Sequence, residues 1–136
     1  MPLIDTNVLV RYLTQDQPDL AARASVVLRE IQSGNREVTL TEAVIIETVN
    51  VLASKQLYGV SREDIRERMV GIILLPGMLI TRKQVYTRAL DFYVAYPRLS
   101  FVDALLLGYA ELEDTPTVVT FDLGFRRVAG IASEEP

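Results

Sequence analysis

The sequence predicts an α/β fold, with a central parallel β-sheet flanked by helices on both faces. Short apolar segments alternate along the chain with longer segments whose apolar residues recur at helical spacing. The 136 residues are 49% hydrophobic and 24% charged, which suits one globular domain with its own core. No linker or internal repeat interrupts the pattern. We therefore expect a single domain over residues 1–132 and a frayed tail over residues 133–136.

Capping residues and helix breakers predict where the helices begin and end. Ser, Thr, Asp and Asn accept a backbone N–H at a helix start, Pro suits the first helical position, and Gly or Pro ends a helix. In chain order, the expected helices cover residues 8–13, 18–33, 42–58, 62–74, 83–96 and 101–112. The expected N-terminal caps are Thr6 or Asn7, Asp16 or Gln17, Thr41, Ser61 and Ser100.

Short apolar segments between these helices predict the strands. They cover residues 3–4, 38–40, 78–80, 117–120 and 128–131. The segment 117–120 reads Thr-Val-Val-Thr, and β-branched residues favour an extended chain. Because helices separate most of the successive strands, we expect parallel pairing.

The chain contains no cysteine and no histidine. This excludes disulfides, zinc–thiolate sites, Ser-His-Asp and Cys-His hydrolysis, and ribonuclease chemistry based on two histidines. Any chemistry must use carboxylates, hydroxyls, amides, Lys or Arg. A metal bound only by oxygen would be a hard ion such as magnesium or manganese. The net charge of −4 gives no overall basic field that would attract nucleic acid.

The N-terminus lacks the pattern of a signal peptide, in which a basic stretch precedes a long apolar one. The longest apolar runs are too short to cross a membrane. We therefore expect a cytoplasmic protein without membrane association.

Two aspartates come just after expected strands. Asp5 follows the strand at residues 3–4, and Asp122 follows the strand at residues 117–120. In open parallel sheets, ligands bind at this end of the strands. A turn or a helix cap is the alternative explanation for each aspartate, because Asp accepts backbone N–H bonds at such positions.

Two further carboxylates lie on apolar helices. Glu47 shares a narrow polar stripe with Asn50 and Ser54, and this stripe faces either solvent or a cleft. Asp103 lies in the first turn of an almost wholly apolar helix. A capping box with Ser100 explains Asp103 locally. A bound cation would instead offset the cost of burying its charge.

Taken together, the four carboxylates indicate a metal site. Strand C-termini and the N-termini of the following helices lie at the same edge of a parallel sheet, so three of the acids should approach one another. Clustered carboxylates repel unless they share protons or a divalent ion. Because a shared proton serves only a pair, four acids favour a metal ion.

Four segments of the chain resemble the PIN domain, and VapC-type toxins of type II toxin–antitoxin systems are the most similar subset. The segments, in order, are residues 3–10 (LIDTNVLV), 47–52 (ETVNVL), 101–105 (FVDAL) and 119–122 (VTFD). The resemblance covers essentially the whole chain. It implies a single PIN-like domain with a Mg²⁺- or Mn²⁺-dependent endoribonuclease activity that leaves a 5′-phosphate and a 3′-hydroxyl.

The resemblance also assigns the site residues. The catalytic and metal-binding acids map to Asp5, Glu47, Asp103 and Asp122, with Glu47 on a second ion or orienting the attacking water. Asn7 and Thr120 match polar residues that support the site. Many relatives carry an acid where this chain has Ser100, which implies weaker binding of a second ion. A metal ion lowers the pKa of bound water, so this chemistry needs no histidine.

Arginines near the acids are candidates for binding RNA phosphates. Arg11, Arg126 and Arg127 follow the first and last acids closely, and Lys55 and Arg98 are further candidates. The alternative for all of them is an ordinary solvated surface.

The resemblance implies a homodimer and a small cognate antitoxin protein. Five apolar residues offer contact surface for such a partner or belong to the core: Tyr58, Met69, Ile72, Ile73 and Leu74.

Two other functions remain open. A non-catalytic binding module on a PIN-like fold would use the acids structurally or to receive a partner's arginine. A haloacid-dehalogenase-like phosphatase also carries an Asp after its first strand. It needs a second Asp two residues later, where this chain has Asn7.

Overall fold

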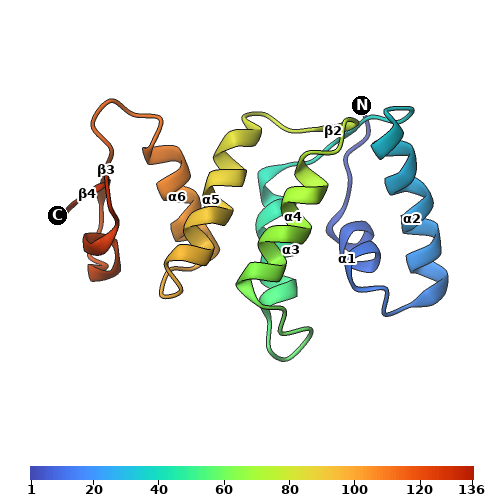
Figure 1. Ribbon diagram of the computed structural model, residues 1–136, viewed down its shortest axis with the longest axis horizontal. Helices are drawn as coiled ribbons and strands as arrows, with labels where there is room; N and C mark the ends of the chain where they lie inside the picture. Colours follow the sequence, from blue (N-terminus) through green and yellow to red (C-terminus); the bar gives the residue numbers. More distant parts are fainter. The chain divides into compact units, whose positions relative to one another are not determined.

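Helices and very short strands alternate along the chain (Figure 1). The computed structural model describes all 136 residues. They form two units, Met1–Lys83 and Gln84–Pro136, which we call unit 1 and unit 2.

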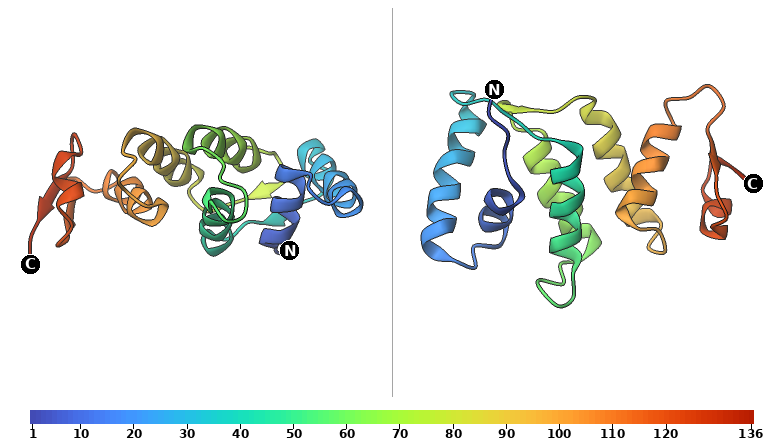
Figure 2. Two further views of the ribbon diagram at one scale, coloured as in Figure 1. Left: turned by 90° about the horizontal axis from the view of Figure 1, so that it is seen from below. Right: turned by 180° about the vertical axis from the view of Figure 1, so that it is seen from behind.

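Unit 1 contains four helices and one small parallel sheet. Helix α1 packs against both α2 and α3, and α3 packs against α4 (Figures 1 and 2). The elements in chain order are α1 (Thr6–Thr14), α2 (Pro18–Ser33), β1 (Val38–Thr39), α3 (Glu42–Ala53), α4 (Arg62–Ile73) and β2 (Met78–Leu79).

Strand β1 has parallel neighbours on both sides. It pairs with β2 in the register Val38↔Met78 and Thr39↔Leu79. On its other side, the N–H of Ile4 donates to the carbonyl of Thr39 at 3.0 Å, and Leu3 forms a parallel bridge with Thr39. The expected strand at residues 3–4 is thus reduced to an isolated bridge beside β1, directly before Asp5.

Gly77 allows the chain to enter β2. A Cβ at this position would lie 2.8 Å from the carbonyl oxygen of Ile31, which is too close for any side chain. The N–H of Gly77 donates to that same oxygen at 2.9 Å, and its carbonyl accepts from Val38. The turn predicted before β2 is thus held against the end of α2.

Three helix boundaries in unit 1 test the capping predictions. Helix α1 begins at Thr6 with Asp5 as its N-cap, so the prediction of Thr6 or Asn7 as the cap is wrong. Helix α2 begins at Pro18 after Gln17 and ends at Gly34, whose φ of 79° is left-handed, as predicted.

Helix α3 ends at Ala53, five residues before the predicted end at residue 58. The reason is a tight turn closed on the carbonyl of Ser54, which accepts the N–H groups of Tyr58 at 2.9 Å and Gly59 at 2.8 Å. Gly59, with φ 57°, ends this turn rather than the helix.

Unit 2 contains α5 (Lys83–Ala95) apart from its first residue, α6 (Phe101–Ala110), β3 (Thr117–Val119), the short 3₁₀ helix η1 (Leu123–Arg127) and β4 (Ala132–Glu134). Helices α5 and α6 approach closely at Gly108, where a Cβ would lie 2.7 Å from the carbonyl oxygen of Val85. Arg88 also joins them, with two hydrogen bonds to Glu111 at 2.7 and 2.8 Å. These bonds raise the pKa of Arg88, so its charge is fixed.

Strands β3 and β4 pair in parallel, in a register that includes Val118↔Ser133. The last strand was predicted at residues 128–131 and instead covers Ala132–Glu134, so that prediction is wrong. Gly130, with φ 82°, interrupts the extended chain, and the apolar Val128 and Ile131 are buried without pairing. Two residues of the expected frayed tail therefore lie in a strand.

The buried residues settle which apolar side chains form the core. Met69, Ile72 and Ile73 are at most 2% exposed, so they belong to the core and offer no contact surface, whereas Leu74 is 58% exposed. Helix α6 is less buried than expected, because Leu106 is 47% exposed.

The α/β class and the parallel pairing of strands are confirmed. Each unit contains one two-stranded sheet. Their continuation into one central sheet stays a prediction.

Candidate active site

Asp5 lies at the junction between the N-terminal segment paired with β1 and the start of α1. It is the N-cap residue of α1, yet its side chain makes no capping hydrogen bond, and it is exposed. The helix start is instead closed by the backbone, with the N–H of Val8 donating to the carbonyl of Asp5 at 3.1 Å. Asp5 is therefore the cap residue by position, but its carboxylate does not cap the helix, so its oxygens are available to a ligand.

The next residue, Thr6, carries an unusual hydroxyl. Its side chain is 3% exposed, and its Oγ1 has no hydrogen-bond partner. An unsatisfied buried hydroxyl costs about 1–3 kcal/mol. A water molecule, an ion or a bound ligand would satisfy such a group.

Glu47 lies on the exposed side of α3. The predicted polar stripe is present: Glu47, Asn50 and Ser54 line one shallow hollow of about 520 Å³. Glu47 makes no ion pair, so its carboxylate is also available to a ligand. The stripe faces solvent across this open hollow, so the structure does not favour a cleft over solvent.

Asp103 is held by the start of α6. The N–H of Asp103 donates to Oγ of Ser100 at 3.1 Å, and the N–H of Ser100 donates to Oδ2 of Asp103 at 3.2 Å. This is a complete capping box, as the local interpretation of the motif predicts. Asp103 is half-buried, and the capping box fixes the direction of its carboxylate.

Asp122 forms a tight turn after β3. Its Oδ1 accepts the N–H of Gly124 at 2.8 Å, and its own N–H donates to Oγ1 of Thr120 at 2.9 Å. The Thr120 hydroxyl thus holds the backbone of Asp122, and its supporting role in a site stays a prediction. The turn explanation for Asp122 also holds, and the side chain is exposed.

The turn of Asp122 packs against the segment that leads into α6. A Cβ at Gly124 would lie 3.3 Å from Cδ2 of Leu99, so the two segments are in close contact. Leu99 directly precedes the capping box of Asp103. The turn of Asp122 thus lies against the residue that precedes the capping box of Asp103.

The four acids divide equally between the units. Asp5 and Glu47 lie in unit 1, and Asp103 and Asp122 lie in unit 2. Neither unit contains three or more acidic side chains close enough to share a metal ion. A common site for all four acids stays a prediction.

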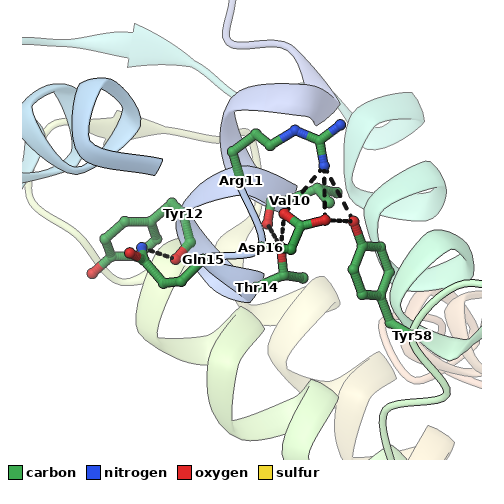
Figure 3. Close-up of polar contacts among 7 residues, drawn as sticks. All are labelled: Val10, Arg11, Tyr12, Thr14, Gln15, Asp16 and Tyr58. Atoms are coloured by element: carbon green, nitrogen blue, oxygen red, sulfur yellow. Dashed lines mark hydrogen bonds and ion pairs between the residues drawn. The ribbon is translucent and has the colours of Figure 1, made fainter. Parts of the chain in front are cut away.

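Arg11, a predicted RNA contact, is part of a polar cluster in unit 1 (Figure 3). Its Nη1 donates to Asp16 at 3.3 Å and to the hydroxyl of Tyr58 at 3.1 Å, and Tyr58 donates to Asp16 at 2.6 Å. The bonds from Tyr58 and Thr14, with the charge of Arg11, lower the pKa of Asp16. Sequence reasoning considered Asp16 only as a helix cap, and nothing local pairs it with Tyr58, 42 residues away.

A second hollow in unit 1, of about 410 Å³, is lined by Asn7 and Arg11 together with Arg23. Asn7 is exposed, two residues after Asp5. Sequence reasoning missed Arg23, which lies on α2, and its side chain reaches this hollow because α1 and α2 pack together.

The two neighbouring arginines of η1 differ in their surroundings. Arg126 pairs with Glu135 at 3.4 Å, whereas Arg127 lines a hollow with Arg98. All three side chains are exposed. Their predicted contact with RNA is untested by this geometry.

Comparison with known proteins identifies the family. The PIN domain family model matches residues 3–131, so the chain belongs to the PIN domain family. PIN domains are generally nucleases that use divalent metal ions and bind RNA, and this chain is accordingly a nuclease-type hydrolase. A search of curated proteins finds no match to the chain.

No helix is both long enough and apolar enough to span a membrane.

Proposed function

We propose that the chain is a metal-dependent endoribonuclease that hydrolyses RNA phosphodiester bonds. The observation that carries the proposal is Asp5, an exposed carboxylate that follows the segment paired with β1 and takes no part in capping the next helix. A carboxylate at this place in a parallel α/β fold is where a ligand is expected to bind. Membership of the PIN family supports the class of chemistry.

The donor set suits a hard divalent ion. Asp5, Asp103 and Asp122 offer only carboxylate oxygens, and the chain has no His or Cys to favour zinc. The partnerless hydroxyl of Thr6 beside Asp5 adds a polar group that a bound ligand or its water would satisfy. We propose that these three aspartates hold Mg²⁺ or Mn²⁺. Because Ser100 is a capping residue here, it contributes no metal ligand.

The other side chains act on water and on RNA. When bound, the ion supplies Lewis acidity that lowers the pKa of a water molecule and offsets charge on the phosphate. Glu47, exposed and without an ion pair, binds a second ion or orients the attacking water. Thr120 fixes the turn of Asp122 through its hydroxyl. Arg126 and Arg127 bind RNA phosphates. Since the attacking group comes from water, preference for RNA must come from binding.

The variant Asp5→Asn tests this function. Asparagine keeps the shape of the side chain, and no capping bond is lost, so the fold should be unaffected. We expect RNA cleavage in Mg²⁺ to fall by about 10²–10³-fold, as for other removed electrostatic groups. The matched control is Asp114→Asn, an exposed aspartate outside the site, which should cleave at the wild-type rate. Equal rates for Asp5→Asn and the control would refute the proposal.

A second measurement separates the nuclease from a binding module. A metal site raises the melting temperature with a saturating dependence on ion concentration. We expect this for wild type in millimolar Mg²⁺ or Mn²⁺ and a weaker rise for Asp5→Asn. If neither ion changes the melting temperature, the non-catalytic binding module is favoured. Turnover of small phosphate esters through a phosphoaspartate would instead favour the phosphatase.

We further propose that the protein is the toxin of a toxin–antitoxin pair and forms a homodimer. The support is the likeness of residues 3–10 and 101–105 to VapC-type toxins. Expression of the chain alone should arrest growth, and co-expression of a small protein encoded immediately upstream should relieve the arrest. Growth unaffected by an active nuclease would contradict the toxin role while leaving the nuclease proposal standing.

A further inference from the structure

A hollow of about 370 Å³ lies beside the turn of Asp122 in unit 2. It is formed by the end of α5, the loop that leads to α6, and η1. Its apolar lining comes from Ala95, Pro97, Leu99 and Leu123. This volume is near the lower end of the range for small-ligand sites, about 300–1,000 Å³.

Two arginines line this hollow without partners of their own. Arg98 comes from the loop before α6, and Arg127 comes from η1. Both are exposed, and neither forms an ion pair. The adjacent Arg126 does not line the hollow and pairs with Glu135 instead. In a chain with a net charge of −4, two unpaired guanidinium groups at one hollow form a local site for an anion.

The aromatic side chain at this hollow is held in place. The ring of Tyr96 stacks on Phe92 with centroids 6.2 Å apart and an interplanar angle of 27°. Its hydroxyl accepts the N–H of Ala129 at 3.3 Å. A fixed ring and an apolar lining provide a surface against which a base or ribose packs.

We propose that this hollow binds one nucleotide of a single-stranded RNA, with a phosphate on Arg98 and Arg127 and the base against Tyr96. The inference rests on the proposed function, which makes RNA the substrate. Single-stranded RNA is bound by the same combination of cationic groups and stacking surfaces. Because Gly124 belongs to both the hollow and the turn of Asp122, the site would position the chain of the RNA next to that carboxylate.

The test measures binding without cleavage. A fluorescently labelled single-stranded RNA is titrated with full-length protein in EDTA, at several salt concentrations, and anisotropy is recorded. We expect Arg98→Gln and Arg127→Gln each to weaken binding about three- to tenfold and to reduce the slope of log affinity against log salt by about 0.7. The double variant should reduce the slope by about 1.4.

The matched control is Arg29→Gln, which makes the same charge change on the exposed face of α2. It should bind as wild type does. Arg126→Gln should lose less affinity than Arg127→Gln, because its guanidinium is already paired. The inference is overturned if Arg127→Gln binds like the Arg29→Gln control, or if losing either η1 arginine has the same effect.

A cross-linking experiment locates the base. RNA containing 4-thiouridine should cross-link to the peptide that carries Tyr96, and cross-links confined to other peptides would overturn the inference. Circular dichroism and melting temperature confirm that each variant is folded. Because no metal is present, loss of binding in the arginine variants supports the nucleotide site even if the wild-type protein proves not to cleave RNA.

Discussion

Asp103 has two separable roles, and replacing it by asparagine or alanine distinguishes them. Its Oδ2 accepts the N–H of Ser100, which stabilises the start of α6, and its charge is proposed to hold a metal ion. Asparagine retains an oxygen that can accept this N–H but removes the charge. Alanine removes both. Asp103→Asn should therefore be folded and inactive, whereas Asp103→Ala should also be less stable.

The expected loss of folding free energy in each variant follows from the interactions of the capping box. Both variants lose the interaction of a negative charge with the N-terminal end of the helix dipole, about 0.3–1 kcal/mol. Only Asp103→Ala loses the acceptor of the Ser100 N–H, and removing a capping side chain costs about 1 kcal/mol. The difference between the two variants is thus about 1 kcal/mol, because the loss of charge is common to both. For a domain of this size, that corresponds to about 3–5 °C in melting temperature.

The assay combines thermal unfolding without metal and RNA cleavage with Mg²⁺. We expect Asp103→Asn to melt about 3–5 °C above Asp103→Ala. Both should cleave about 10²–10³-fold more slowly than wild type. Cleavage by Asp103→Asn at the wild-type rate would refute the metal-binding role. Equal melting temperatures for the two variants would refute the capping role.

Three further predictions concern the fold. Tyr58→Phe removes the largest cause of the lowered pKa of Asp16, so that pKa should rise toward its ordinary value of 3.8, measured by NMR titration. Gly108→Ala should destabilise unit 2 by about 1–2 kcal/mol in urea unfolding, because the contact with the carbonyl of Val85 outweighs a gain of about 1 kcal/mol in helix propensity. A chain that ends at residue 132 loses the pairing of β4 and should be about 1–2 kcal/mol less stable.

For each of these three predictions, one measured result would contradict it. A lowered folded pKa means that the Asp16 carboxylate stabilises the fold fully above pH 3.8 and loses that contribution as the pH falls below it. If the acid unfolding of Tyr58→Phe matched wild type, the bond would add nothing. If Gly108→Ala were more stable than wild type, α5 and α6 would be able to move apart at this position without a loss of stability. An unchanged truncated chain would support the frayed tail.

Features set by neighbouring residues could be predicted from the sequence. The capping box of Ser100 and Asp103, and the Pro18 start and Gly34 end of α2, depend on residues within a few positions. Local signals failed where three candidates compete. Asp5, Thr6 and Asn7 can all cap a helix, and the pairing of residues 3–4 with β1 keeps the chain extended up to Asp5.

Features that depend on distant contacts could not be predicted. The start of β4 is set by its register with β3, and no periodicity in so short a segment shows which residues pair. The separate surroundings of Arg126 and Arg127 depend on the direction each side chain takes in η1. The importance of Asp16 depends on Tyr58, which lies in the turn that follows the early end of α3 at Ala53.

The capping box also has an entropic consequence for ligand binding. The carboxylate of Asp103 already occupies one rotamer, because the Ser100 amide holds it, so a ligand would find it immobilised in advance. Glu47 is longer and unrestrained, and binding would have to freeze it, at about 0.5–1.5 kcal/mol. The acids are therefore unequally preorganised. Asp103 is rigid before any ion binds, whereas Glu47 is flexible until an ion orders it.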